Sequence, residues 1–258
     1  MSIANYKEHR QAFNALLDKD CSKPILLFKG ESGTGKSALL KHCRNQINSD
    51  IHQVPVGLPD ISNVMQIFLH TGRCLSWNHF ENFKQQLGQL NPQFKINVEG
   101  NTQAGVGNII NVELNALLEN TTLEQREERY TILTNAWAED INNLDNPCVL
   151  LLDIYDQANT EIKRWIAGDF LNCASTSRQM RVVIAGQSVP ESFGWGHCCE
   201  LKELYGVHEA EEWLPVIKAM GRKIPAQNPI DFLAGICYTC KGIPADIVKI
   251  IETFPRQH

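Results

Sequence analysis

The sequence lacks an excess of positive charge and any hydrophobic run long enough to cross a bilayer. Its 258 residues include 24 Lys and Arg against 29 Asp and Glu, so the formal net charge is −5. This acidic balance disfavours a general nucleic-acid-binding surface, although a local basic patch is compatible with it. Residues 1–20 are amphipathic and mixed in charge, unlike a secretory signal peptide. We therefore expect no membrane segment, and nucleic acid is a disfavoured partner.

A disulfide framework and a clear zinc motif are also missing. The nine cysteines are an odd number, and Cys148 and Cys173 fall in apolar patterns. Such usage is typical of a reduced, cytoplasmic protein. Cys237 and Cys240 form a C-x-x-C, but a zinc site normally has a second such pair, and these positions are also one helical turn apart. We expect the two cysteines to pack rather than to bind metal.

One strong motif is present near the N-terminus. The apolar segment Ile25–Phe28 leads into G-x-x-x-x-G-K-S, and a helical pattern follows at Ala38. In such a phosphate loop, backbone N–H groups and the positive end of the helix surround a β-phosphate. Lys36 is expected to reach the β- and γ-phosphates, and Ser37 to ligate Mg²⁺. A chance Gly/Ser-rich turn is the disfavoured alternative. The predicted nucleotide-binding residues are Gly30, Glu31, Ser32, Gly33, Thr34, Gly35, Lys36, Ser37 and Ala38.

A second motif is the apolar run Val149–Leu152 that ends in Asp153. An acid at the carboxyl end of a central strand is expected to hold Mg²⁺ beside the loop serine. The next residue is Ile154, where many ring-forming ATPases have a glutamate that polarises the attacking water. Asp156 either takes that role, or helps to order the waters of Mg²⁺, or caps the helix that begins near Asn159. Because no base is firmly placed, we expect slow hydrolysis.

The order of elements predicts an α/β fold. Apolar strands alternate with helical patterns, which indicates a parallel sheet covered by helices on both faces, as in P-loop NTPases. The strand at 181–185 is expected to lie between the loop strand and the acid strand. Gln187 or Ser188 would then face the γ-phosphate, although a plain turn is the alternative reading. The expected strands lie at about 24–29, 52–56, 148–152, 181–185 and 199–201.

Two domains are expected, a nucleotide-binding α/β domain over residues 1–204 and a helical lid over 205–258. The first begins with a helix within residues 1–20. The Asn- and Gly-rich segment 91–111 predicts an inserted, mobile hairpin, because two short β-branched stretches flank its glycines. Thr121 and Glu124 have the spacing of a capping box and predict the start of a long helix.

Together these motifs resemble the STAND class of AAA-related NTPases, the signal-transduction ATPases that include the NACHT and NB-ARC switches. The resemblance rests on the phosphate loop, on Asp153-x-x-Asp156, and on Gly242-Ile243-Pro244, which looks like the family's G-x-P turn in a helical lid. It covers roughly residues 24–254, and it implies that Pro244 lies against the nucleotide base. The family usually has arginine where this chain has Gln187, a departure that puts strong hydrolysis in doubt.

The expected function is an ATP-binding switch with slow Mg²⁺-dependent hydrolysis, in which ATP or ADP controls lid closure. The resemblance implies a protein partner and homo-oligomerisation. Arg178 and Arg181 are weak candidates for an arginine finger. A scaffold locked by bound nucleotide is the alternative, and a small-molecule kinase is less favoured. The expected catalytic residues are Lys36, Asp153, Asp156 and Gln187, and the expected metal ligands are Ser37 and Asp153.

Overall fold

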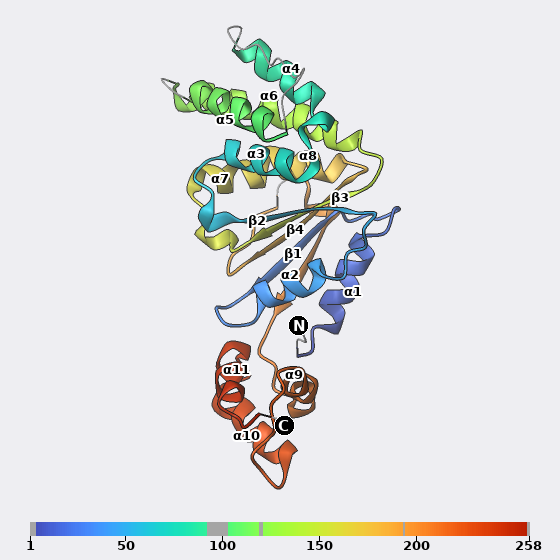
Figure 1. Cartoon of the computed structure of the whole chain (residues 1–258), viewed down its shortest axis with the longest axis vertical. Helices are drawn as coiled ribbons and strands as arrows, with labels where there is room; N and C mark the ends of the chain where they lie inside the picture. The colour runs from blue at the N-terminus through green and yellow to red at the C-terminus, as the bar shows by residue number, and fades with distance from the viewer. Residues whose placement is uncertain (1–3, 92–102, 119–120, 193, 257–258) are drawn as a thin grey trace.

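The computed structural model describes residues 4–91, 103–118, 121–192 and 194–256. Its centre is one five-stranded sheet in the order β2-β3-β4-β1-β5, in which every neighbouring pair is parallel (Figure 1). The predicted parallel sheet is therefore confirmed, and β4 lies between β1 and β3 as expected. The strands are β1 (Ile25–Gly30), β2 (His52–Gly57), β3 (Cys148–Asp153), β4 (Met180–Gly186) and β5 (Cys199–Leu204).

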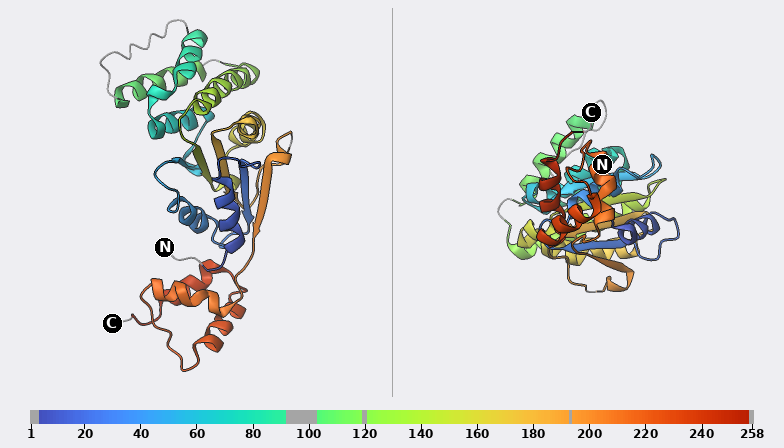
Figure 2. Two further views of the ribbon diagram at one scale, coloured as in Figure 1. Left: turned by 90° about the vertical axis from the view of Figure 1, so that its right-hand side faces the viewer. Right: turned by 90° about the horizontal axis from the view of Figure 1, so that it is seen from below.

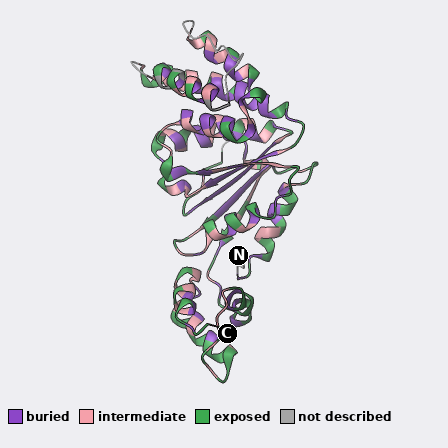
Figure 3. Cartoon of the chain, viewed as in Figure 1, coloured by how far each residue is buried: buried purple, intermediate pink, exposed green. Residues whose placement is uncertain are grey.

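Helices cover both faces of this sheet (Figures 1 and 3). Side chains alternate along each strand, so Leu150 and Leu152 enter one core while Val149 and Leu151 enter the other. On one face lie α1 (Lys7–Leu16) and α2 (Lys36–Arg44). The other face carries α3 (Val64–Leu75), α7 (Thr160–Trp165), a π-helical turn (Ile166–Phe170) and α8 (Leu171–Thr176), with α4 (Glu81–Leu90), α5 (Gln103–Leu118) and α6 (Leu123–Asn142) above them.

The prediction of a hairpin at 91–111 is wrong where the structure describes it. Residues 103–111 belong to α5, which packs against α3 and α4. Val106, Ile110, Leu114 and Leu117 are buried at helical spacing, and this periodic packing outweighs the β preference of the β-branched run. The first expected strand of the hairpin lies outside the described residues.

The start of α6 differs from the prediction by one residue. Thr122, rather than Thr121, is the N-cap, and its hydroxyl accepts a hydrogen bond from the Gln125 amide at 3.3 Å. The Gln125 side chain accepts in return from the Thr122 amide at 3.0 Å, so the capping box uses glutamine instead of Glu124.

A helical C-terminal region follows β5 and lies next to α2 (Figure 2). It contains a 3₁₀ turn (Ala210–Trp213), α9 (Leu214–Ala219), α10 (Pro229–Thr239) and α11 (Pro244–Glu252). Trp213, Leu233, Ile247 and Ile251 are buried and continue the core that lies under α1 and α2. Across the described part of the chain, no helix combines the length and the apolar character needed to span a membrane.

A buried carboxylate joins α6 to α4. Asp140 is 3% exposed and accepts hydrogen bonds from the amides of Asn82 at 3.1 Å and Phe83 at 2.8 Å. The N-cap of α4, Phe80, makes no side-chain capping hydrogen bond. Asp140, which belongs to α6, therefore accepts the hydrogen bonds of amides in the first turn of α4. Burial raises the pKa of Asp140, while these two amide donors lower it.

Replacing Asp140 by alanine is expected to lower the free energy of unfolding by about 2 kcal/mol, because two buried amides lose their acceptor. Asp140→Asn keeps one acceptor oxygen and should lose less. Urea titration followed by circular dichroism measures both. Asp145→Ala, at an exposed turn before β3, is the control and should stay near wild type. A wild-type midpoint for Asp140→Ala would show that this contact does not stabilise the helical layer.

Candidate functional site

The glycine-rich loop joins β1 to α2 at the carboxyl edge of the sheet. Gly33 and Gly35 have φ values of +82° and +88°, a region that L-residues with a side chain rarely adopt. A Cβ on Gly33 would also lie 2.9 Å from Cγ2 of Ile243 in the C-terminal region. Backbone shape and close packing therefore both require glycine at position 33.

Lys36 begins α2 and folds back over the loop. Its Nζ donates to the carbonyl oxygens of Gly30 and Glu31, each at 2.7 Å. Burial lowers the pKa of the Lys36 ammonium, and the nearby carboxylates of Asp156 and Asp153 act in the opposite direction. The ammonium is thus placed by backbone carbonyls at the wall of a cavity that also has acidic groups.

Ser37 and Asp153 meet across the sheet edge. The Ser37 hydroxyl donates to Oδ1 of Asp153 at 3.0 Å, and the Ile154 amide donates to the same oxygen at 2.9 Å. Ile154 has a φ of +58°, an uncommon conformation for a β-branched residue. The two side chains form a pair of hard oxygen donors, the type of ligand that suits Mg²⁺.

Asp156 and Gln187 form a second pair. Oδ1 of Asp156 accepts from the Gln187 amide at 2.7 Å, and Oδ2 lies 3.4 Å from Nε2 of Gln187. Asp156 does not cap the next helix, because the side chain of Asn159 accepts from the Ile162 amide at 2.9 Å and fills that role. A Cβ on Gly186 would stand 2.4 Å from the Ser188 carbonyl oxygen, so the turn after β4 requires glycine there.

These groups border one cavity of about 450 Å³. It brings together all four expected catalytic residues and Pro244. Gly30, Glu31 and Thr34 are not part of its wall, because Gly30 lies against Leu204 and Thr34 is buried beneath the loop. Of the predicted residues, those on the wall are Ser32, Gly33, Gly35, Lys36, Ser37, Ala38, Asp153, Asp156, Gln187 and Pro244.

A second cavity of about 220 Å³ adjoins the first and is mostly apolar. Gly35, Ala38, Pro244 and Val248 line both cavities, so the two spaces meet at the start of α2 and α11. The wall of the second cavity is completed by Ala4, Tyr6, Trp213, Val216, Ala219, Met220 and Glu252.

The two ends of the described chain converge on the glycine-rich loop. The buried Tyr6 hydroxyl donates to the Thr34 carbonyl, and burial raises its pKa to about 12. From the other end, the Ala245 amide donates to the Gly33 carbonyl at 3.0 Å. The Asn5 amide reaches Glu212 at 3.1 Å and links the two ends. The sequence analysis missed Tyr6, because its hydrogen bond to Thr34 joins residues 28 positions apart and leaves no local pattern.

Arg181 has a structural role that rules out its use as an arginine finger. The residue is 2% exposed, and its Nε donates to the carbonyl of Leu16 at 3.0 Å. The guanidinium also donates to the carbonyls of Asp18 and Lys19, so it satisfies the end of α1 and the following turn. Arg178, the other candidate, is exposed.

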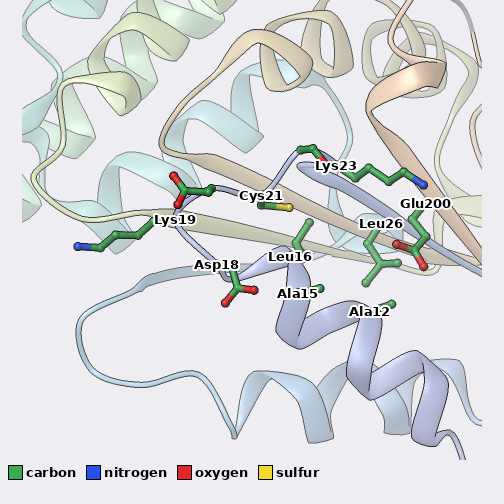
Figure 4. Close-up of a pocket in the computed structure, with 11 residues that line it drawn as sticks. Ala12, Ala15, Leu16, Asp18, Lys19, Cys21, Lys23, Leu26 and Glu200 are labelled. Atoms are coloured by element: carbon green, nitrogen blue, oxygen red, sulfur yellow. The ribbon is translucent and has the colours of Figure 1, made fainter.

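A third cavity, of about 530 Å³, lies beside this turn, at the opposite end of β1 from the glycine-rich loop (Figure 4). Asp18, Lys19, Cys21, Lys23 and Glu200 stand around it. None of the predicted site residues lines it.

Comparison with solved structures places the fold. A Walker-type ATPase of Pyrococcus abyssi superposes with a TM-score of 0.50 at 11% identity, over 97% of this chain and 67% of that one. Cdc6p from Pyrobaculum aerophilum gives a TM-score of 0.51 at 12% identity, over 97% of this chain and 60% of that one, so this chain spans less than two thirds of Cdc6p. No protein-family description and no curated protein matches the sequence. The fold is that of the P-loop NTPases, and membership of the STAND class stays a prediction.

The Tyr6 contact can be tested by removing one atom. Tyr6→Phe keeps the ring but leaves the Thr34 carbonyl without its donor, so we expect a loss of about 1 kcal/mol in unfolding free energy. Amide hydrogen exchange in peptides covering residues 30–37 should become faster while exchange in β3 stays unchanged. Unchanged exchange in the loop would mean that the N-terminal segment does not hold it.

Proposed function

We propose that this protein is a Mg²⁺-dependent ATP-binding switch with slow hydrolysis. The carrying observation is the single cavity that joins the glycine-rich loop, Lys36, the Ser37–Asp153 oxygen pair and the Asp156–Gln187 pair. Backbone amides of the loop and the N-terminus of α2 supply the positive potential that a β-phosphate needs. Lys36 would exchange its bonds to loop carbonyls for bonds to phosphate oxygens.

Ser37 and Asp153 would hold the magnesium ion. Their oxygens already lie 3.0 Å apart, and Mg²⁺ usually takes one or two protein ligands together with phosphate oxygens and water. When bound, the ion supplies charge neutralisation at the phosphates. The chain's own contribution is to fix the two oxygens, because the Ile154 amide and the Ser37 hydroxyl both orient the Asp153 carboxylate.

The second, mostly apolar cavity is the proposed binding site of the nucleotide base. It shares the lining residues Gly35, Ala38 and Pro244 with the polar cavity, and in this proposal the nucleotide spans both. The flat apolar base would then contact Pro244 and Trp213, and its polar edge would meet solvent or backbone. The proposed preference for ATP over GTP rests on the STAND resemblance alone. The same resemblance implies that Pro244 contacts the nucleotide base.

In this proposal Asp156 is the general base that accepts the proton of the attacking water, and hydrolysis is slow. The residue that follows Asp153 is Ile154, which cannot accept a proton from water. Asp156 is bound to Gln187 at the carboxyl end of the sheet and lines the same cavity as Lys36, the residue proposed to bind the phosphates. We expect the Asp156 carboxylate, oriented by its hydrogen bond from Gln187, to act as a general base.

The region 205–258 is the proposed lid. Ala245 binds the loop carbonyl of Gly33, and Ile243 packs against the same glycine. A nucleotide changes such a contact only if it binds the two lid positions unequally. Lid movement would expose or cover a surface for a protein partner or a second copy, in the manner the STAND resemblance implies. A scaffold with permanently bound nucleotide remains the second candidate, favoured by Ile154 in place of a glutamate.

Lys36→Ala is expected to weaken Mg²⁺·ATP and Mg²⁺·ADP binding about 100-fold, because the charged side-chain donor to phosphate is lost. Isothermal titration calorimetry measures both affinities. Lys41→Ala, which removes an exposed lysine from the same helix, is the matched control and should bind as wild type. Wild-type affinity in Lys36→Ala would refute the nucleotide site.

Asp156→Asn is expected to retain nucleotide but to lower the rate of phosphate release by at least tenfold, since an amide cannot accept the proton from water. Single-turnover conversion of labelled ATP by purified protein measures the rate. If Asp156→Asn hydrolyses ATP at the wild-type rate, Asp156 is not the base and the scaffold reading gains support.

A further inference from the structure

Two cysteines at the end of α10 have no role in the proposed function. Cys237 is 2% exposed and packs in the core of the C-terminal region. Cys240 is half-buried and is the C-cap of α10, and both residues are free thiols. Packing therefore fixes the position of Cys237, whereas Cys240 lies where the helix ends and the backbone can adjust.

The backbone carbonyls of these cysteines shape the turn that follows α10. The Gly242 amide donates to the Cys237 carbonyl at 2.8 Å, and the Ile243 amide donates to the Cys240 carbonyl at 2.9 Å. Lys241, the residue after Cys240, has a φ of +51°, an uncommon value for a residue with a side chain. Movement of Cys240 would therefore act directly on the Ile243 amide.

The same turn contacts the glycine-rich loop. Cγ2 of Ile243 lies so close to Gly33 that it leaves no room for a Cβ there, and the Ala245 amide donates to the Gly33 carbonyl at 3.0 Å. Pro244, between these two residues, lines both cavities of the candidate site. A displacement of Cys240 would therefore reach the loop through the short segment 243–245.

A disulfide between the two cysteines would require such a displacement. Side chains three positions apart on a helix have Cβ atoms about 5–6 Å apart, whereas the Cβ atoms of a disulfide are about 3.5–4.5 Å apart. The two Cβ atoms must therefore approach one another by about 1–2 Å. Because Cys237 is packed in the core and Cys240 ends the helix, Cys240 is the residue expected to move.

We propose that Cys237 and Cys240 are a reversible disulfide site, and that oxidation weakens the contact of Ala245 with the glycine-rich loop and speeds nucleotide release. The disulfide and the weakened contact do not depend on a bound nucleotide, whereas the effect on release rests on the proposed function. The pair would thus couple the redox state of the surroundings to the position of the C-terminal region.

The oxidant in this proposal is a small-molecule disulfide. The Cys240 thiolate attacks one of its sulfur atoms and releases a first small thiolate. The Cys237 thiolate then attacks Sγ of Cys240 and releases the second, so the protein loses two electrons and two protons and the small disulfide becomes two thiols. Burial raises the pKa of both cysteine thiols, so the exchange is run at mildly alkaline pH, where more thiolate is present.

The first measurement tests the disulfide. Purified protein is incubated with oxidised glutathione, alkylated and digested with trypsin, which releases residues 224–241 as one peptide that contains Cys237, Cys240 and no other cysteine. We expect this peptide to escape alkylation and to be lighter than its reduced form by two hydrogens, and dithiothreitol to reverse the change. Cys240→Ser should not form this product. Cys173→Ser, which changes a half-buried cysteine in α8, is the matched control and should form it as wild type does. Alkylation of both cysteines after oxidation would overturn the proposal.

The second measurement tests the link to the loop. Amide hydrogen exchange in peptides covering residues 30–37 and 242–248 should be at least about threefold faster in the oxidised protein, the size expected for one weakened hydrogen bond. Labelled ADP should dissociate faster by a similar factor. Cys240→Ser treated with the same oxidant should keep the rates of its untreated form. Equal exchange, or equal release of bound ADP, in the oxidised and reduced proteins would overturn the link. Protein that binds no nucleotide in either form would refute the proposed function, while the peptide mass and the exchange rates would still decide the disulfide and its effect on the loop.

Discussion

The parallel pairing of β4 between β1 and β3 is the constraint on which the site depends. Carboxyl ends of parallel strands share one edge of a sheet, so this order brings the loop after β1, Asp153 at the end of β3 and Gln187 after β4 to one cavity. The sheet can hold that order because its alternating side chains fill a separate core on each face. The site is therefore a consequence of strand order together with three short turns.

The sequence was informative wherever the signal was local. Apolar strands, the glycine-rich loop and Asp153 each occupy a few consecutive residues, and the parallel sheet follows from their alternation with helices. Contacts between residues that are distant in the sequence could not be predicted from it. The helix α5 replaced a predicted hairpin because burial of Val106 and Ile110 against other helices outweighed local β preference. Arg181 satisfies the end of α1 through backbone carbonyls that no spacing reveals.

Two tethers connect the glycine-rich loop to the ends of the described chain, through Tyr6 on one side and Ala245 on the other. A change in loop shape on phosphate binding would therefore act on both contacts. The Asp156–Gln187 pair lies on the wall of the same cavity as the loop, at the carboxyl end of β4.

The proposed function depends on nucleotide binding in the glycine-rich cavity. The most direct measurement incubates purified protein with labelled Mg²⁺·ATP, removes free nucleotide and identifies what stays bound over several hours. We predict close to one nucleotide per chain, with ATP converted slowly to ADP. Protein that retains neither ATP nor ADP would show that the cavity is not a nucleotide site.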